Sequence, residues 1–283
     1  MFTLEDFDLN GANVLVRCDL NSPIRDGEVK DDTKIKACIP TLNYLLDSNA
    51  NITILSHQGR PFSGLIDLSP HSKELDHLLD VDVNFCDSIF SSHALEEIKN
   101  NAGVLVLNNT RLYSEEVRNV SLSKCENSYL VNKFSPNFDY FVNDAFGAIH
   151  RSQVSLIGFA RKMPMISGKL MEKELDALKR TRDSEMDGTK TLILGGAKVD
   201  DSIKVIEESL KKDNFDYILT TGIVSLIFLL AKGYNLGDRT IGFIEENKLL
   251  ESVRMAEELL EIGFEKIKTP VDISMDWRGR YEI

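Results

Sequence analysis

Short apolar, β-rich runs alternate with helical patterns through almost the whole 283-residue sequence. Several runs are continuously apolar, which is typical of strands covered on both faces. Strand–helix alternation predicts parallel, doubly wound α/β sheets. The expected strands form two series, one at 13–20, 51–57, 81–86, 104–110 and 140–146, the other at 191–196, 217–222, 240–245 and 268–275.

The helical patterns divide the chain into two domains. Apolar stripes predict helices over 33–47, where we expect Pro40 to split the helix, and over 246–262. The charged segment around 169–182 lies between the two strand series and lacks a strand partner of its own. We therefore expect two α/β domains joined by a helix: an N-terminal domain at 1–165, an interdomain helix at 166–185 and a C-terminal domain at 186–283.

Charge and composition exclude several classes of function. The net charge of −12 argues against non-specific binding to nucleic acid. The longest apolar run, 223–231, is too short to span a bilayer, and the acidic N-terminus is unlike a signal peptide. Cys18, Cys38, Cys86 and Cys125 show no metal-binding or disulfide-framework spacing, so they are interpreted as small residues of a reducing cytosol. We expect a cytoplasmic monomer with no membrane or nucleic-acid partner.

Polar side chains follow the strands of the first series. In open parallel sheets, ligands bind beyond the carboxyl ends of the strands, where these side chains meet. Taken singly, each side chain is more often a solvated or capping group, and Arg17, inside a strand, is interpreted as structural. The candidates are Asp19 and Asn21 after the first strand, Lys34 at the next helix, His57 and Arg60 after the second strand, Arg111 after the fourth, and Asp144, His150 and Arg151 after the fifth.

The convergence of these residues points to an anionic ligand. An acidic chain with five potential cations at one sheet edge needs a negatively charged partner for them, and arginine matches carboxylate and phosphate geometry. The five are Lys34, His57, Arg60, Arg111 and Arg151. Asp19 and Asn21 add acceptors for hydroxyl groups. The expected ligand is small, with a carboxylate or phosphate at its ends and a hydroxyl between them.

The second series carries glycines at its strand ends. The stretch 191–202, TLILGGAKVDDS, has neither P-loop nor dinucleotide-fingerprint spacing. Gly195 and Gly196 permit close backbone approach, a helix that begins near 199–201 offers amides to an anion, and Lys198 adds a charge. Alone, the stretch fits a structural turn equally well. Beside a cationic crevice on another domain, it becomes a candidate nucleotide-phosphate site, with Gly222 at the next strand end.

These segments, in this order, closely resemble phosphoglycerate kinase, and the resemblance covers essentially the whole chain. The matching stretches are VLVRCDLNSPIRDGEVKDDTKIKACIPTL, ILSHQGRP, NNTRLYSEE, FVNDAFGAIHRSQVSLIGFA, GKLMEKEL and LILGGAKVDDSI. The stretches SHQGRP, HRSQ, KVDDS and LTTG are most similar to the archaeal branch of the family.

The resemblance implies two Rossmann-like domains that close about a hinge, with phosphoglycerate on the first and the nucleotide on the second, which is incomplete here. The implied reaction is phosphoryl transfer between 1,3-bisphosphoglycerate and ADP with Mg²⁺, giving 3-phosphoglycerate and ATP. By similarity, Lys34 and Lys198 are catalytic. The implied phosphoglycerate-binding residues are Asp19, Asn21, Lys34, His57, Arg60, Arg111 and Arg151, and the implied nucleotide-binding residues are Gly195, Gly196, Lys198, Ser202 and Gly222.

The sequence departs from the family pattern in three places. Lys34 stands where the family has an arginine that contacts the substrate carboxylate, and Ser202 stands where many members have lysine. The segment with a late glycine-rich turn is missing after TPVDIS, so we expect a C-terminally truncated chain. The alternative function is therefore an inactive, 3-phosphoglycerate-binding fragment. A nicotinamide oxidoreductase would need a GxGxxG motif after an early strand, which 19–27 (DLNSPIRDG) does not provide.

Overall fold

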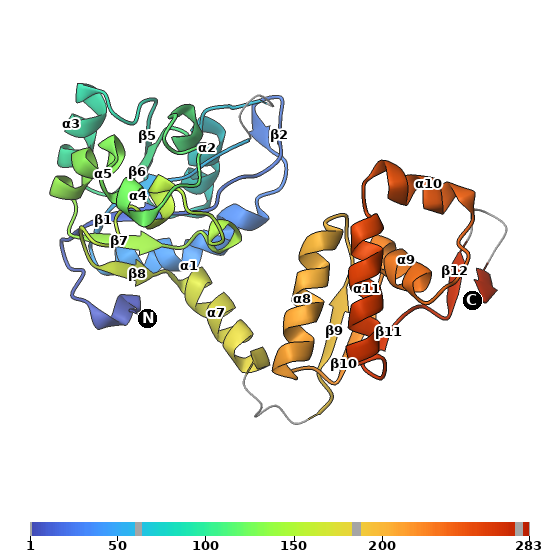
Figure 1. The fold of residues 1–283 in the computed structure, drawn as a ribbon. Coiled ribbons are helices and arrows are strands. Elements are labelled where there is room, and N and C mark those ends of the chain that lie inside the picture. Colours follow the sequence, from blue (N-terminus) through green and yellow to red (C-terminus); the bar gives the residue numbers. More distant parts are fainter. Residues whose placement is uncertain (1, 60–63, 183–187, 275–279, 283) are drawn as a thin grey trace. The chain divides into compact units, whose positions relative to one another are not determined.

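The computed structural model describes residues 2–59, 64–182, 188–274 and 280–282. The chain divides into two compact units, Met1–Leu178 and Lys179–Ile283, which are drawn in Figure 1. The long helix α7 (Lys169–Arg182) begins in the first unit and crosses the boundary, where the sequence predicted an interdomain helix.

The first unit is built on a six-stranded parallel sheet in the order β5-β6-β4-β1-β7-β8. The chain passes from β1 to β4 on one side and later returns to β7 on the other side of β1, so the strand order reverses at β1. Five strands were predicted; β8 was not. The strands are β1 (Asn13–Arg17), β4 (Asn51–Leu55), β5 (Val83–Cys86), β6 (Val104–Leu107), β7 (Tyr140–Asn143) and β8 (Met165–Ser167).

Apolar cores cover both faces of this sheet, which explains the continuously apolar strands. Along β1, Val14 and Val16 belong to the core that includes residues of α1 and α2, whereas Leu15 belongs to the core that includes residues of α3, α5 and α6. The helices are α1 (Thr33–Asp47), α2 (Ser69–Leu78), α3 (Ser92–Asn100), α4 (Leu122–Glu126), α5 (Tyr129–Phe134) and α6 (Val154–Ile157).

The predicted break of the first helix at Pro40 is wrong, because α1 continues through that residue. A proline inside a helix costs about 3 kcal/mol. Here Ile35 lies before Pro40, and Leu42 and Leu45 lie after it, and all three are buried in the same core. Packing of both halves of the helix against the sheet therefore outweighs the local cost.

The second unit contains a three-stranded parallel sheet in the order β11-β10-β9. The strands β12 and β13 form a separate two-stranded antiparallel sheet. The strands are β9 (Thr191–Leu194), β10 (Tyr217–Thr220), β11 (Ile267–Lys268), β12 (Asp272–Ser274) and β13 (Arg280–Glu282), and the helices are α8 (Val199–Lys212), α9 (Gly222–Ala231), α10 (Asp238–Glu246) and α11 (Leu250–Gly263).

Two strand predictions in this unit need correction. Residues 240–245 belong to the helix α10, in which Ile241 and Ile244 lie three residues apart and Ile244 is buried. The run 268–275 is divided between β11 and β12, which belong to different sheets. In the described parts of both units, no helix is long and apolar enough to cross a membrane.

Candidate active site

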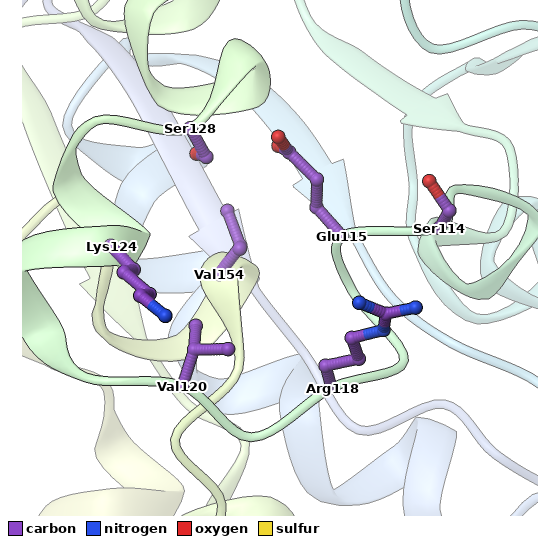
Figure 2. A pocket seen from close by; sticks show the side chains of 7 residues that line it. All are labelled: Ser114, Glu115, Arg118, Val120, Lys124, Ser128 and Val154. Carbon is purple, nitrogen blue, oxygen red and sulfur yellow. The ribbon is translucent and has the colours of Figure 1, made fainter.

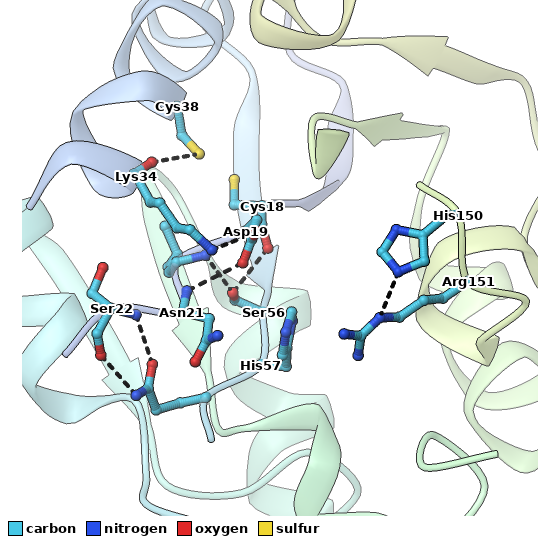
Figure 3. Close-up of polar contacts among 12 residues, drawn as sticks. Cys18, Asp19, Asn21, Ser22, Lys34, Cys38, Ser56, His57, His150 and Arg151 are labelled. Carbon is cyan, nitrogen blue, oxygen red and sulfur yellow. Dashed lines mark hydrogen bonds and ion pairs between the residues drawn. The ribbon is translucent and has the colours of Figure 1, made fainter. Parts of the chain in front are cut away.

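Asp19, Asn21 and Lys34 lie together at the carboxyl end of β1 (Figure 3). The Lys34 Nζ is 3.0 Å from Asp19 Oδ2, and Asp19 Oδ1 accepts a hydrogen bond of 3.3 Å from the Asn21 amide. The Asn21 side-chain oxygen accepts a 3.0 Å bond from the amide of Gly59, in the loop after β4. The loops that follow β1 and β4 are therefore joined, as the sequence predicted for neighbouring strand ends.

Asn109 ties the loop after β4 to the loop after β6. Its side-chain oxygen accepts the amides of Gln58 (3.1 Å) and Arg111 (3.0 Å). Its side-chain nitrogen donates to the carbonyls of Gln58 and Ile66, both at 2.8 Å. Asn109 is fully buried, so these four bonds satisfy the whole amide. The buried Asn109 side chain therefore holds the backbone next to His57 and at Arg111 in place.

Arg111 is 6% exposed and follows β6 in the short helix η2 (Thr110–Leu112). Its guanidinium donates to the Gly59 carbonyl, across to the loop after β4. Burial, followed by the positive charges of Arg151 and Arg17, lowers the pKa of Arg111. The predicted site residue Arg60 lies outside the residues that the structure describes.

Four positively charged side chains lie close enough to His57 to lower its pKa. Its pKa is lowered to about 2, first by burial and then by the charges of Arg17, Arg111, Arg151 and Lys34. Arg151, partly buried, follows η4 (Phe146–Ala148) beyond β7, and Figure 3 shows its guanidinium extending toward His57. The structure therefore brings Lys34, His57, Arg111 and Arg151 to one edge of the sheet, and His57 is neutral there.

Asp144 has a structural role instead of facing this edge. Its carboxylate accepts hydrogen bonds from the Thr41 hydroxyl of α1 (2.7 Å) and from the Met171 amide in the first turn of α7 (3.1 Å). Burial raises its pKa, and these bonds oppose that effect. Asp144 is fully buried and joins the end of β7 to the middle of α1 and to the first turn of α7, so it holds the fold around the site.

In the second unit, the predicted glycines lie together at the carboxyl ends of β9 and β10. Gly196 and Gly222 have positive φ angles of 100° and 56°. A Cβ atom on Gly195 would lie 2.3 Å from the Thr221 Oγ1, so only glycine fits this approach. The helix α8 begins at Val199 with Lys198 exposed at its N-cap. The Ser202 hydroxyl points back to the Gly195 carbonyl, at 3.5 Å.

A separate cavity of about 330 Å³ lies in the first unit, and Figure 2 shows the side chains around it. Arg118 and Lys124 line it together with the Glu115 carboxylate, which also accepts a 2.6 Å bond from the Tyr113 hydroxyl. None of the residues predicted for the active site is among those described as lining it.

Comparison with known proteins identifies the family. The family model described as phosphoglycerate kinase matches residues 4–280. The chain belongs to the phosphoglycerate kinase family. It is 45% identical to the phosphoglycerate kinase of Pyrococcus horikoshii over 287 aligned residues, which cover 100% of this chain and 70% of the relative. The enzyme of Methanothermus fervidus is 39% identical, with 99% of this chain and 69% of the relative covered.

Solved structures of phosphoglycerate kinases share the fold. The crystal structure from Pyrococcus horikoshii matches with a TM-score of 0.92 and 45% identity, covering 100% of this chain and 71% of that one. The structure from Coxiella burnetii matches with a TM-score of 0.74 and 26% identity, covering 96% and 66%. The α/β fold and the family predicted from the sequence are confirmed.

Three buried residues near this candidate site were missed or taken only as structural from the sequence. Arg17, at the end of β1, donates to the Ser155 hydroxyl (2.8 Å) and is bonded to His57 (2.8 Å). Ser155 in turn donates to the fully buried Glu116 carboxylate at 2.5 Å. A charged residue inside an apolar strand is the one signal that the sequence offered for this network.

Proposed function

We propose that the chain catalyses the reversible transfer of a phosphoryl group between 1,3-bisphosphoglycerate and ADP, giving 3-phosphoglycerate and ATP. The observation that carries the proposal is the arrangement in the first unit, where a neutral histidine and three cations from separate elements lie near the Asp19–Asn21 turn. We assign phosphoglycerate binding to the domain at 1–165 and nucleotide binding to 186–283, with the helix at 166–185 between them.

The first unit suits an acid with a terminal phosphate. Lys34, Arg111 and Arg151 supply positive charge for its carboxylate and phosphate, and Arg60 belongs to the same proposed set. Asn21 and Asp19 supply polar partners for its hydroxyl group. The guanidinium groups bind phosphate and carboxylate oxygens in pairs, so they fix the orientation of the ligand as well as its charge.

The second unit suits nucleotide phosphates. Gly195, Gly196 and Gly222 carry no side chains at the strand ends, and α8 begins directly after Lys198, so its first amides lie beside this lysine. Among the described residues, no group of three or more His, Cys, Asp or Glu side chains is placed to hold a metal ion by itself. Mg²⁺ is commonly held by one or two carboxylates and by substrate phosphates, so Asp201, exposed in the first turn of α8, is the residue that we propose for it. The bound metal would neutralise charge on the phosphates.

The reaction needs positioning more than proton transfer. In the direction of ATP consumption the nucleophile is the substrate carboxylate, which is already ionised, so no general base is required. Phosphoryl transfer then depends on alignment and on positive charge around the transferred group. We assign this charge to Lys34 on the acid side and to Lys198 on the nucleotide side.

The second candidate function is binding of 3-phosphoglycerate without turnover. It is favoured by the fact that the first unit contains all the described phosphoglycerate-side residues. A coupled assay with 3-phosphoglycerate, ATP and Mg²⁺ distinguishes the two candidates. Turnover by the 283-residue chain supports the kinase, whereas calorimetric binding of 3-phosphoglycerate without turnover supports the binding protein.

The Arg151→Ala variant tests the acid side of the proposed site. We expect it to weaken 3-phosphoglycerate binding by about 10- to 100-fold, because a charge-assisted hydrogen bond contributes about 1.5–3 kcal/mol. Thermal melting followed by circular dichroism should change little, since Arg151 makes only one described side-chain bond, to His150. Arg161→Ala is the matched control, because Arg161 is exposed and pairs with Glu126 elsewhere in the same unit. A large loss of melting temperature would indicate a structural role.

The Lys34→Arg variant tests the departure from the family pattern. We expect several-fold faster turnover, because a guanidinium replaces a point charge with a two-pronged donor. The upper bound is about 3 kcal/mol, or about a hundredfold, the value of one preorganised donor. Lys36→Arg, on the same helix and paired with Asp32 at 2.7 Å, is the control and should leave turnover unchanged. An unchanged or lower rate in Lys34→Arg would contradict the idea that lysine is a handicap.

We also propose that the protein is a cytoplasmic monomer that binds small molecules. All four cysteines are free and buried, as expected for a chain kept in a reducing compartment. The strongly negative net charge favours small anionic ligands at local cationic sites over nucleic acid.

A further inference from the structure

Arg17 is fully buried, and all three nitrogen atoms of its guanidinium are hydrogen-bonded. Its Nε donates to the Ser155 Oγ at 2.8 Å, one terminal nitrogen donates to the Cys18 carbonyl, and the other lies 2.8 Å from the His57 Nδ1. The backbone of Arg17 is itself fixed within β1, between β4 and β7. The guanidinium is therefore a rigid group behind the site, out of reach of any ligand.

The bond to His57 determines which imidazole nitrogen carries the proton. A guanidinium has five N–H donors and no acceptor, so Nδ1 of His57 accepts this bond and carries no proton. In a neutral imidazole the proton is then on Nε2. Within the described part of the chain, Nε2 has no hydrogen-bond partner, so its N–H is available to a ligand.

We propose that Arg17 is a positioning residue that holds His57 as the Nε2–H tautomer, so that His57 presents a neutral hydrogen-bond donor to the phosphoglycerate site. This inference rests on the proposed function for its ligand, but the state of His57 can be measured in the free protein. The donor would bond a carboxylate or hydroxyl oxygen of the acid substrate.

The surrounding charges make a neutral histidine the stable form. Arg17 and Arg111 stand on the strand and loop beside His57, Lys34 on α1, and Arg151 on the loop after β7; the negative charges nearest to this group are Asp19 and the buried Glu116. A protonated His57 would be repelled by these four positive charges. A neutral N–H donor can orient the ligand through a directional hydrogen bond without adding another positive charge.

The network behind Arg17 explains why the guanidinium can stay charged and fixed. Ser155 Oγ accepts from Arg17 and donates to Glu116 Oε1 at 2.5 Å, and the Ser155 amide donates to Glu116 Oε2 at 2.9 Å. Burial lowers the pKa of Arg17, and the negative charge of Glu116 is the first effect that opposes this. Since arginine stays protonated in proteins, the orientation of the Nδ1 bond is fixed over the working pH range.

The tautomer can be measured by NMR on the 283-residue chain labelled with ¹⁵N-histidine. His57→Gln identifies the His57 signals among those of the five histidines. We expect the Nδ1 resonance of an unprotonated, acceptor nitrogen and the Nε2 resonance of a protonated one, unchanged from pH 8 to pH 5.5. A proton on Nδ1, or an imidazole that becomes charged in this range, would overturn the proposal.

Two substitutions of His57 separate its two nitrogens. The amide nitrogen of glutamine can occupy the position of Nε2, whereas that of asparagine lies at the position of Nδ1. We expect His57→Gln to bind 3-phosphoglycerate at least about tenfold more tightly than His57→Asn, because only glutamine retains the donor toward the ligand. Equal affinities for the two variants, measured by calorimetry, would contradict the assignment.

Arg17→Lys tests the link itself, because lysine keeps the charge but cannot bond Ser155, Cys18 and His57 together. We expect a mixture of His57 tautomers and about tenfold weaker 3-phosphoglycerate binding. Arg25→Lys, at an exposed position in the β2–β3 hairpin (Ile24–Arg25 and Glu28–Val29), is the control. If Arg17→Lys does not fold, the wild-type NMR result and the His57 pair still decide the proposal.

The two proposals fail in different ways. If the wild-type chain does not bind 3-phosphoglycerate, the proposed function fails, while the tautomer measured in the free protein still supports or overturns the role of Arg17. If it binds 3-phosphoglycerate but His57 carries its proton on Nδ1, the proposed function stands and the role of Arg17 is overturned.

Discussion

Lowering the pH from 7.5 to 5 is expected to reduce the free energy of unfolding by about 4 kcal/mol, because two buried histidines are neutral in the folded protein. Burial, followed by nearby positive charges, lowers the pKa of His57 to about 2. Burial lowers the pKa of His71 to about 4, against the opposing charge of Asp67. Both side chains are almost fully buried, so solvent screens little of this effect.

The direction follows from proton uptake in the two states. The unfolded chain binds a proton at each histidine below about pH 6.5, whereas the folded chain does not until pH 4 for His71 and pH 2 for His57. Stability is therefore complete above pH 6.5 and is lost as the pH falls below it. At pH 5, about 1.5 pH units below the unfolded value, each histidine costs about 2 kcal/mol.

The carboxyl group of Asp144 changes the stability in the opposite direction as the pH falls. Burial raises the pKa of Asp144, so the folded state takes up its proton more readily than the unfolded state as the pH falls. This gains stability on the acid side of the range and offsets a part of the loss at the lowest pH values. The wild type and His71→Gln share this contribution of Asp144, so the difference between them isolates the loss due to His71.

Urea unfolding followed by circular dichroism at pH 7.5, 6.5, 5.5 and 5 measures this loss. His71→Gln should remove about half of it, because the pKa of His71 is lowered by burial of its own side chain and not by the positive charges around His57. His93→Gln is the matched control: His93 is exposed, with a weak 3.9 Å pairing to Glu97, and its removal should leave the pH dependence as in the wild type. A stability that is flat from pH 7 to pH 5 would contradict the neutral, buried state of both histidines.

The strands of the first unit could be predicted because their burial on both faces is visible as uninterrupted apolar runs. The loop residues could be predicted because parallel strands bring their carboxyl ends to one edge, which holds for Asn21, Lys34 and Arg111. In the second unit, the strand β9 was predicted from its apolar run, although Thr191 and Ile193 are exposed in the structure. The run 240–245 was not, because six residues with mixed spacing fit a strand or a helix, and the buried Ile244 decides for the helix.

The hydrogen bonds that hold the site residues in place could not be predicted from the sequence, because they join residues that lie far apart in the chain. Asn109 lies 51 residues from Gln58, and Arg17 lies 138 residues from Ser155. A lone arginine in an apolar strand has many possible partners, and its neighbours on the chain do not indicate which is used. The assignment of Asp144 had the same difficulty, since the carboxylate belongs to Thr41 and to the start of α7.

Glu116→Gln is expected to destabilise the first unit by about 3–5 kcal/mol, a cost typical of breaking a buried charge arrangement by removing one partner. The Glu116 carboxylate is fully buried and accepts two bonds from Ser155. Glutamine has a single acceptor oxygen, so its amide group would meet one of the two Ser155 donors without an acceptor. The buried guanidinium of Arg17 would also lose the charge that offsets its burial.

Glu115→Gln is the control that isolates burial, because Glu115 is the adjacent residue and is only partly buried. Its carboxylate accepts the Tyr113 hydroxyl at 2.6 Å and the Tyr129 amide at 3.1 Å, so the loss should be about 1 kcal/mol. Urea unfolding at pH 7.5 provides both values. A cost for Glu116→Gln as small as that of Glu115→Gln would contradict the role of Glu116 in balancing Arg17.

The double variant Arg17→Met, Glu116→Gln determines whether the two residues act as one unit. Each single variant leaves the other member of the pair buried without its partner, whereas the double variant leaves no buried charge there. We therefore expect the double variant to cost at least about 2 kcal/mol less than the sum of the two single variants. Additive losses of unfolding free energy would mean that Arg17 and Glu116 are stabilised separately, although both contact Ser155. Strong coupling would mean that the carboxylate holds the guanidinium, and through it the imidazole of His57, in a single arrangement.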